Sequence, residues 1–161
     1  FPSDTVNVAL DDLGIEPDLV ISGINDGQNY GPLVDVSGTV GAARTAARRG
    51  IPALAASQES VEEPAVPDYA TGVTFVIDWL DGNLDLIAAG ELAAEVENLN
   101  VPSCTTGSVR GLAEVPSATD IENGKFSKAN CESTLEDPMD DVEAFNNGFA
   151  SLSPVTLEKA D

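Results

Sequence analysis

The part of the chain that most constrains its fold is residues 17–57, where two apolar runs flank a helical pattern. Residues 18–22 (DLVIS) and 51–56 (IPALAA) are short apolar runs of the kind that form buried strands. Between them, residues 37–49 place valine and alanine at helical spacing, and Gly50 is suited to end a helix. The order strand, helix, strand predicts a βαβ unit with two parallel strands.

The loop after the first apolar run carries side chains that could bind a cation. Asn25, Asp26 and Asn29 follow the predicted strand, and ligands of open α/β sheets bind where strands end. Their oxygen atoms suit a hard divalent cation such as Mg²⁺, Mn²⁺ or Ca²⁺. The same residue types are also typical of turns, because they tolerate left-handed backbone conformations. The spacing leaves both interpretations open.

The start of the predicted helix is a candidate anion site. Ser37, Gly38 and Thr39 stand where a helix has unpaired N–H groups and the positive end of its dipole, which suits a phosphate. Ordinary N-capping by Ser37 would produce the same pattern. The segment has neither the lysine nor the glycine spacing of the common nucleotide-binding loops. Three arginines of the same helix could attract anions, although such residues are more often a solvated helix face. They are Arg44, Arg48 and Arg49.

The composition excludes several kinds of site and partner. The 161 residues include 28 acidic and 7 basic ones, a net charge of -21, so a nucleic acid polymer is not expected as a partner. There is no histidine, which excludes Ser-His triads and histidine-bound zinc. No apolar run is long enough to span a bilayer, so no membrane is expected either. Cys104 and Cys131 are interpreted as either a disulfide or two buried thiols.

The remaining sequence predicts further helices and strands around this unit. Helical patterns with apolar stripes occur over residues 3–13, 68–80, 84–97 and 138–147. Strand-like runs occur over residues 98–102, 108–115 and 149–154. The first helix is expected to pack beside the first strand. Together these elements predict an α/β fold with a Rossmann-like core.

Several details of this arrangement are also predicted. Asp68 is expected to cap a helix that residues 81–83 (DGN) then break. Residues 116–137 are expected to form a loop or arm with a hairpin at residues 123–124. The acidic pair at residues 140–141, like the other acidic pairs, is interpreted as solvated surface. The expected buried stripe of the capped helix consists of Val73, Val76, Ile77 and Leu80, and Trp79 is expected in the core.

These motifs together resemble the SurE survival-protein family, whose members are metal-dependent 5′/3′-nucleotidases or broad acid phosphatases acting on nucleoside monophosphates. The strongest resemblance lies in PDLVISGINDGQNYG at residues 17–31, SGTVGAA at 37–43 and GIPALAAS at 50–57. It extends to PSDTV at residues 2–6, LNVP at 99–102, DVEAF at 141–145 and GFASLSP at 148–154. The resemblance therefore spans nearly the whole chain.

The resemblance implies roles for five residues. Asn25 matches the family's metal-binding asparagine, while Asn29 and the turn of Ser37, Gly38 and Thr39 match residues that line the phosphate and nucleotide pocket. A divalent cation, Mg²⁺ or Mn²⁺ before Ca²⁺, would polarise a phosphoryl oxygen and activate a bound water. Donors at the helix start would stabilise the charge that develops on the phosphoryl group. No catalytic residue is assigned within this chain.

The chain also departs from the family pattern. The family's first strand ends in an Asn-Asp-Asp-Gly motif whose aspartates hold the metal, and this sequence begins after that motif. The acidic pair at residues 11–12 lies in a predicted helix and is no substitute. We therefore expect an upstream segment of the same protein, or a partner chain, to complete the site and cover the sheet edge. The expected fold is a three-layer Rossmann-like sandwich of SurE type, incomplete at the N-terminus, with a short β arm.

The resemblance also divides the chain and implies an assembly. Residues 1–102 would be the C-terminal part of the core, residues 103–137 an arm or loop for oligomerisation, and residues 138–161 the closing helix, strand and tail. A homodimer or tetramer is expected. The expected function is phosphatase activity on nucleoside monophosphates that requires the upstream segment; the alternative is a non-catalytic structural or assembly module. Acidity and the cysteines favour export, periplasmic or extracellular, over the cytoplasm, and a Cys104–Cys131 disulfide would strengthen that expectation.

Overall fold

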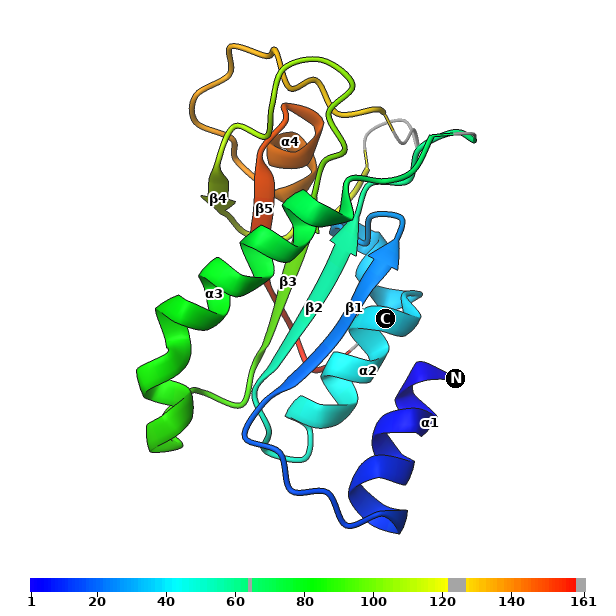
Figure 1. The fold of residues 1–161 in the computed structure, drawn as a ribbon, viewed down its shortest axis with the longest axis vertical. Coiled ribbons are helices and arrows are strands. Elements are labelled where there is room, and N and C mark those ends of the chain that lie inside the picture. Colours follow the sequence, from blue (N-terminus) through cyan, green and yellow to red (C-terminus); the bar gives the residue numbers. More distant parts are fainter. Residues whose placement is uncertain (64, 122–126, 159–161) are drawn as a thin grey trace.

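The computed structural model describes residues 1–63, 65–121 and 127–158, which form a mixed sheet with helices on both faces (Figure 1). The described strands are β1 (Val20–Asp26), β2 (Ala53–Gln58), β3 (Val96–Val101), β4 (Leu112–Glu114) and β5 (Ala150–Val155). Their order across the sheet is β1-β2-β3-β5-β4. β1, β2 and β3 run parallel, whereas β5 is antiparallel to β3 and β4 is parallel to β5. β1 and β4 are therefore the edges of this sheet.

The helices complete the three layers that the sequence predicts. The described helices are α1 (Pro2–Asn7), α2 (Gly38–Ala47), α3 (Tyr69–Ala89) and α4 (Asp141–Asn146). A π-helical turn (Val8–Asp12) extends α1, and a 3-10 turn (Gly31–Asp35) precedes α2. Figure 1 shows α1 and α2 on one face of the sheet, α3 on the other, and α4 near the carboxyl ends of the parallel strands. The α/β fold with a Rossmann-like layered core is confirmed.

Each face of the sheet buries its own hydrophobic cluster. On the α2 face the cluster consists mainly of small residues: Val34, Val40, Ala43, Ala46, Ala47, Ala53, Ala55, Val96 and Val155. On the α3 face larger side chains pack together: Leu54, Trp79, Leu99, Val101, Ala150 and Leu152. The alanines bring α2 close to the sheet, because their side chains are small. Trp79 lies in the core, as the sequence predicts.

β1 is longer than the sequence predicts. The expected loop begins at Gly23, but the strand continues to Asp26 and pairs with β2 after a register shift between Ser22 and Asn25. The shift occurs at Gly23, whose φ is +133°, and a Cβ there would lie 2.2 Å from the carbonyl oxygen of Ala56. Only glycine fits this irregularity. The strand thus carries Asn25 within the sheet instead of presenting it on a free loop.

α3 also differs from its prediction. Asp68 caps it as expected, by accepting a hydrogen bond from the backbone of Thr71. The predicted break at residues 81–83 is wrong, since the helix continues to Ala89 and ends at Gly90, whose φ is +67°. One glycine inside a helix costs only about 1 kcal/mol, which packing of α3 on the sheet offsets. The predicted stripe is half right: Val76 and Leu80 pack on the core, while Val73 and Ile77 are 46% and 49% exposed.

Most of the other predicted elements are present with shifted bounds, but the separate helix expected over residues 84–97 is wrong, because α3 takes up residues 84–89 and β3 begins at Val96. α1 packs against α2, and not beside the first strand, because Gly38 and Gly41 let Pro2 and Ser3 approach closely. β3 and β5 confirm two predicted strands, α4 confirms the helix after residue 138, and β4 forms three residues of the run at 108–115. The hairpin expected at residues 123–124 lies outside the described residues. No described helix has the length and apolar character needed to cross a membrane.

Candidate functional site

The end of β1 places Asn25 at the edge where the parallel strands finish. The Nδ2 of Asn25 donates hydrogen bonds to the carbonyl oxygens of Gly27, at 2.7 Å, and Asp26, at 3.2 Å. The Oδ1 of Asn25 accepts no hydrogen bond from the described residues. Asp26 is exposed, and its carboxylate accepts a 2.7 Å hydrogen bond from the hydroxyl of Ser60. The amide of Asn25 is therefore oriented by its nitrogen, which leaves its oxygen available to a ligand.

Asn29 is turned inward and holds the loop to the sheet. Its backbone N–H donates to Oδ1 of Asn100 at 2.6 Å, and its carbonyl accepts from Nδ2 of Asn98 at 2.6 Å. Its own Nδ2 donates to the hydroxyl of Ser57 at 2.9 Å. Asn98, Asn100 and Ser57 are all buried on the α2 face of the sheet. Both Asn25 and Asn29 also donate to the carbonyl of Gly27, at 2.7 and 3.4 Å, so the structure brings these two predicted site residues together.

A buried carboxylate holds the next part of the loop. Asp141, the first residue of α4, is fully buried and accepts hydrogen bonds from the N–H groups of Gly31, at 3.0 Å, and Ala118, at 2.8 Å. The hydroxyls of Ser117 and Ser153 donate to it at 3.1 and 3.3 Å. The interpretation of this acidic pair as solvated surface is wrong for Asp141, because four donors replace the water around it.

The side chain of Ser37 caps the N-terminus of α2 in the usual way. The hydroxyl of Ser37 accepts a 3.1 Å hydrogen bond from the N–H of Val40, so the capping interpretation is confirmed. A Cβ on Gly38 would lie 3.1 Å from the ring of Pro2, so that glycine faces α1. Thr39 is half-buried. No hydrogen bond joins these three residues to the two asparagines described above, within the described part of the chain, although both groups lie at the carboxyl edge of the sheet.

Arg44 of α2, and Arg48 and Arg49 directly after this helix, hold segments of the chain together. The expectation that Arg44 belongs to a solvated face is wrong, since it is 1% exposed. It donates to the carbonyls of Val34 and Thr156 at 2.9 Å and to the carboxylate of Asp35 at 2.8 Å. A buried guanidinium needs such partners, because an unpaired charge in the interior is costly. Arg44 thereby ties α2 to the 3-10 turn and to the segment after β5.

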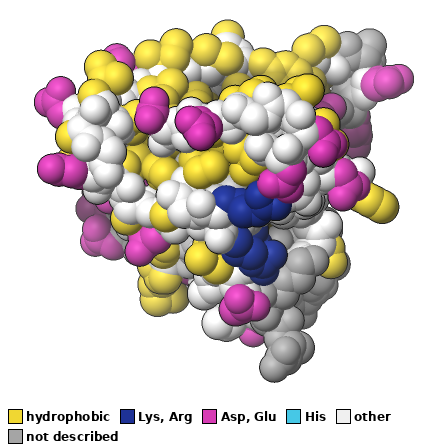
Figure 2. All heavy atoms as spheres, turned by 90° about the horizontal axis from the view of Figure 1, so that it is seen from below, with side chains coloured by type: hydrophobic (Ala, Val, Ile, Leu, Met, Phe, Trp, Pro, Cys, Tyr) yellow, Lys and Arg dark blue, Asp and Glu magenta, His cyan; other side chains and the backbone are white. Residues whose placement is uncertain are grey.

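The two exposed arginines are paired as well. Arg48 donates to the carbonyl of Leu157, and Arg49 donates to both carboxylate oxygens of Asp11 at 2.7 and 2.8 Å. The hydrogen bond from Arg49 holds the pKa of the Asp11 carboxyl below its usual value. Figure 2 views the end opposite the candidate site and shows basic side chains gathered in one place among apolar and acidic ones. These pairs give the arginines structural roles.

Sequence patterns did not single out the residues that support the loop. Asn98 and Asn100 stand two positions apart in the short strand β3, and both are buried. Two asparagines at alternate positions among apolar residues are a sequence signal that could have identified them, because buried amides need hydrogen-bond partners. Tyr30 is fully buried against Phe145, with ring centroids 5.0 Å apart. Burial raises the pKa of the Tyr30 phenol above its ordinary value of 10.0. These side chains fix the shape of the loop at residues 27–31 from the side of the sheet and of α4.

The sequence of this chain is similar to those of known proteins. Residues 1–126 match the family described as Survival protein SurE. The chain belongs to the SurE family. It is 31% identical to "5'-nucleotidase SurE" of Fervidobacterium nodosum and 32% identical to that of Thermosipho africanus, over 97% of this chain in each case. The chain spans 64% of the length of both relatives.

A solved structure supports the same fold assignment. The SurE protein from Aquifex aeolicus superimposes with a TM-score of 0.68, covering 99% of this chain and 68% of that one, at 23% identity. This likeness concerns the fold. The relatives' names describe a nucleotidase, so the family to which this SurE chain belongs includes nucleotidases.

The described residues contain no complete set of ligands for a metal ion. No group of three or more histidine, cysteine, aspartate or glutamate side chains in that part could hold a metal ion. The Oδ1 of Asn25 is a suitable ligand for a hard cation but is a single one. The described donors at this edge would therefore fit at most one side of a coordination sphere.

The two cysteines of the SurE chain form a disulfide, Cys104–Cys131, which decides between the two open interpretations. Beside it, the buried carboxylate of Glu59 accepts hydrogen bonds from the N–H groups of Ser103, at 2.8 Å, and Ala129, at 2.9 Å. The disulfide and the carboxylate together attach the segment after residue 127 to the ends of β2 and β3. This covalent link stands beside the carboxyl edge on which Asn25 lies.

Proposed function

We propose that this chain belongs to a metal-dependent phosphatase that hydrolyses phosphate monoesters of nucleoside 5′- and 3′-monophosphates. The observation that carries the proposal is the Oδ1 of Asn25, which is left free at the carboxyl edge of the sheet while hydrogen bonds to the buried side chains of Asn98 and Asn100 hold the loop around it. A ligand atom held in this way loses little entropy on binding. The relatives named 5'-nucleotidase SurE support the reaction at the level of the family; activity on 3′-phosphates is part of the proposal.

The proposed cofactor is a divalent cation, Mg²⁺ or Mn²⁺, with Ca²⁺ as the alternative. Asn25 would provide one oxygen ligand. We propose that carboxylates on a segment beside β1 provide the others, because β1 pairs only with β2 among the described strands and its second edge can accept another strand. That segment belongs either to the same protein or to a partner chain. When bound, the cation would polarise a phosphoryl oxygen and lower the pKa of a bound water.

The residues of this chain would bind and orient the substrate phosphate. The first N–H groups of α2, at Gly38 and Thr39, stand at the positive end of a ten-residue helix, and Ser37 retains a hydroxyl proton to donate. Asn29 would line the pocket and keep the loop in register through its bonds to Asn98 and Asn100. Donors that are fixed before the substrate arrives stabilise the charge of the transition state most effectively.

The test is phosphate release from nucleoside 5′- and 3′-monophosphates by the full-length protein, with and without Mg²⁺ or Mn²⁺. Asn25→Ala should lower the metal-dependent rate by about 100-fold or more, because it removes a ligand atom. Asn25→Asp keeps an oxygen at that position and should retain more of the rate. Asn130→Ala, which removes an exposed asparagine, is the matched control and should leave the rate unchanged. Full-length protein without metal-dependent turnover would refute the proposal.

A second candidate is a non-catalytic structural or assembly module with the SurE fold. It is favoured by the absence of a carboxylate cluster for a metal within the described residues. Under either function we propose a homodimer or tetramer, exported to an oxidising compartment that keeps the Cys104–Cys131 bond. Light scattering of the full-length protein gives the oligomer size. A well-folded oligomer that neither binds Mn²⁺ nor releases phosphate would establish the assembly module.

A further inference from the structure

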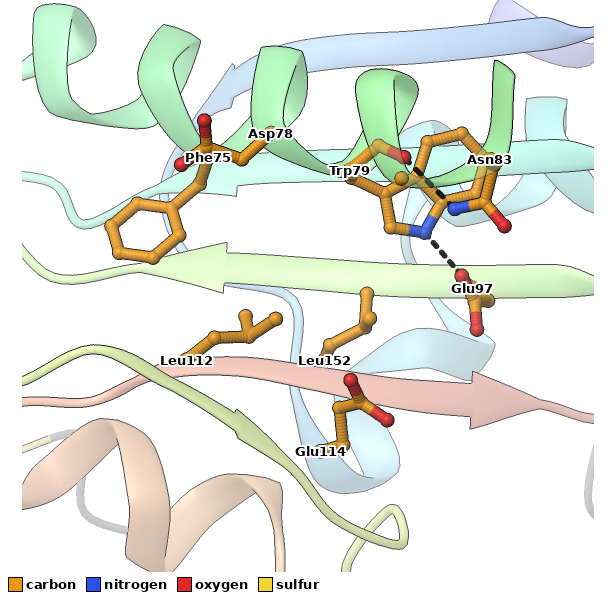
Figure 3. A pocket seen from close by; sticks show the side chains of 9 residues that line it. Phe75, Asp78, Trp79, Asn83, Glu97, Leu112, Glu114 and Leu152 are labelled. Atoms are coloured by element: carbon orange, nitrogen blue, oxygen red, sulfur yellow. Dashed lines mark hydrogen bonds between the residues drawn. The ribbon is translucent and has the colours of Figure 1, made fainter. Parts of the chain in front are cut away.

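A second candidate site lies on the opposite face of the sheet from Asn25. A cleft of about 420 Å³ opens between α3 and the strands β4 and β5 (Figure 3). Its apolar lining comes from Phe75 and Trp79 on α3, Leu112 on β4 and Leu152 on β5. Trp79 and Leu152 are buried, whereas Leu112 is 44% exposed. An exposed leucine beside an aromatic surface offers apolar area that a ligand could cover.

Three carboxylates surround this apolar lining. They belong to three different elements: Asp78 on α3, Glu97 on β3 and Glu114 on β4. None of the three forms an ion pair with a lysine or arginine of the described residues. One of them, Glu97, accepts a hydrogen bond from Nε1 of Trp79, which fixes the indole in the wall (Figure 3). As far as the described residues go, the cleft therefore combines carboxylates that have no basic ion-pair partner with an apolar surface.

We propose that this cleft binds a linear alkyl polyamine. The methylene chain of such a molecule would cover Phe75, Leu112 and Leu152, and its ammonium groups would meet the carboxylates. A hydrated metal ion is a poorer match for this cleft than a polyamine, because it would balance the negative charge but leave the apolar lining uncovered. The described residues also contain no cluster that could hold a metal ion directly. The volume lies within the range of small-molecule sites. The cleft shares no residue with the proposed phosphatase site, so each can fail without the other.

The chain provides its own reporter for this site. Trp79 is the sole tryptophan of the sequence, and its indole N–H is bonded to a cleft carboxylate. We would titrate the full-length protein with spermidine at an ionic strength of about 0.15 M, where charges further apart than about 8 Å are screened. Binding should change the tryptophan fluorescence saturably in the full-length protein but not in its Trp79→Phe variant, and calorimetry should give one equivalent for the unsubstituted protein.

Two variants and one matched control separate a specific site from general attraction to an acidic protein. Glu114→Gln should weaken spermidine binding about 2–5-fold, as expected for one exposed ion pair. Leu112→Ser should weaken it about 3–10-fold through lost apolar contact. Asp85→Asn changes the net charge by the same amount on α3 but lies outside the cleft, and should leave the affinity unchanged. Glu114 and Leu112 are exposed on an edge strand, so both variants should keep the wild-type circular dichroism.

Several results would overturn the proposal. Equal losses for Asp85→Asn and Glu114→Gln would show that the attraction is diffuse. Equal binding of Mg²⁺ would show that the apolar lining contributes nothing. A trilysine peptide that binds where spermidine does not would make the cleft a protein-docking surface instead.

Discussion

The buried carboxylate of Asp141 gives the sharpest test of how the loop that follows β1, at residues 27–31, is held in place. Asp141→Asn preserves the shape of the side chain but puts an N–H₂ where one acceptor oxygen was. The hydroxyls of Ser117 and Ser153 can rotate to accept from the new donor, whereas the backbone N–H of Gly31 cannot, because its direction is set by the chain. One backbone donor in the interior is then left without an acceptor.

The magnitude follows from these contacts. A buried donor left without a partner costs about 1–3 kcal/mol, and the remaining bonds lose the strength of a charged acceptor. A neutral amide is easier to bury than a carboxylate, which offsets part of this cost. We expect Asp141→Asn to lower the free energy of unfolding by about 2 kcal/mol. Asp141→Ala, which removes the acceptor of all four donors, should lower it by about 4 kcal/mol.

The assay is urea unfolding followed by circular dichroism, with Asp137→Asn as the control. Asp137 is exposed and close in sequence, so this control should change the free energy of unfolding by less than about 0.5 kcal/mol. Amide hydrogen exchange at Gly31 should accelerate in Asp141→Asn, because its bond to the carboxylate is lost. If the two Asp→Asn variants are equally stable and Gly31 stays protected, the loop is not held by this carboxylate.

Three further predictions concern other parts of the fold. Replacing both cysteines by serine removes a link across 27 residues and should lower the free energy of unfolding by about 3.5 kcal/mol on the loop-entropy model; an unchanged urea midpoint would contradict it. Gly23→Ala should lower the free energy of unfolding by about 3 kcal/mol or more, because the new Cβ would lie 2.2 Å from a backbone carbonyl oxygen. Gly82→Ala in α3 should raise it by about 0.5–1 kcal/mol, because its Cβ meets nothing within 4 Å. Thermal unfolding of the two variants compares these effects. The raised pKa of Tyr30 favours the neutral phenol, so its stabilising contribution is complete below about pH 10 and is lost as pH rises through the folded-state pKa; Tyr30→Phe should flatten this alkaline fall in the free energy of unfolding.

Much of the architecture could be predicted because it depends on local patterns. The βαβ unit at residues 17–57 follows from two apolar runs, a helical spacing and a stop at Gly50, and each of these is a property of neighbouring residues. Ser37 and Asp68 cap their helices as their types suggest. The family resemblance rests on the same stretch of sequence. Local chemistry was sufficient wherever an element's ends are decided by its own residues.

Other features depend on partners that are distant in sequence. β1 continues to Asp26 because β2 offers a strand to pair with. α3 continues through Gly82, and Val76, Trp79 and Leu80 in the turns before it pack on the sheet. Arg44 and Asp141 look like surface charges in the sequence, yet both are buried, since segments up to 112 residues away supply their hydrogen-bond partners. No local pattern contains that information.

For the candidate site, the sequence by itself determined which residues could bind a cation or a phosphate: Asn25, Asn29 and the turn at Ser37, Gly38 and Thr39. Only the tertiary structure decided how they are used. It bonds the side chain of Asn29 to Ser57, while the buried amides of Asn98 and Asn100 hold the backbone of Asn29. It leaves the oxygen of Asn25 free, because the nitrogen of that amide is bonded to the carbonyl of Gly27. The type of a residue defines what it can bind, and its neighbours in space define which of its atoms remain available.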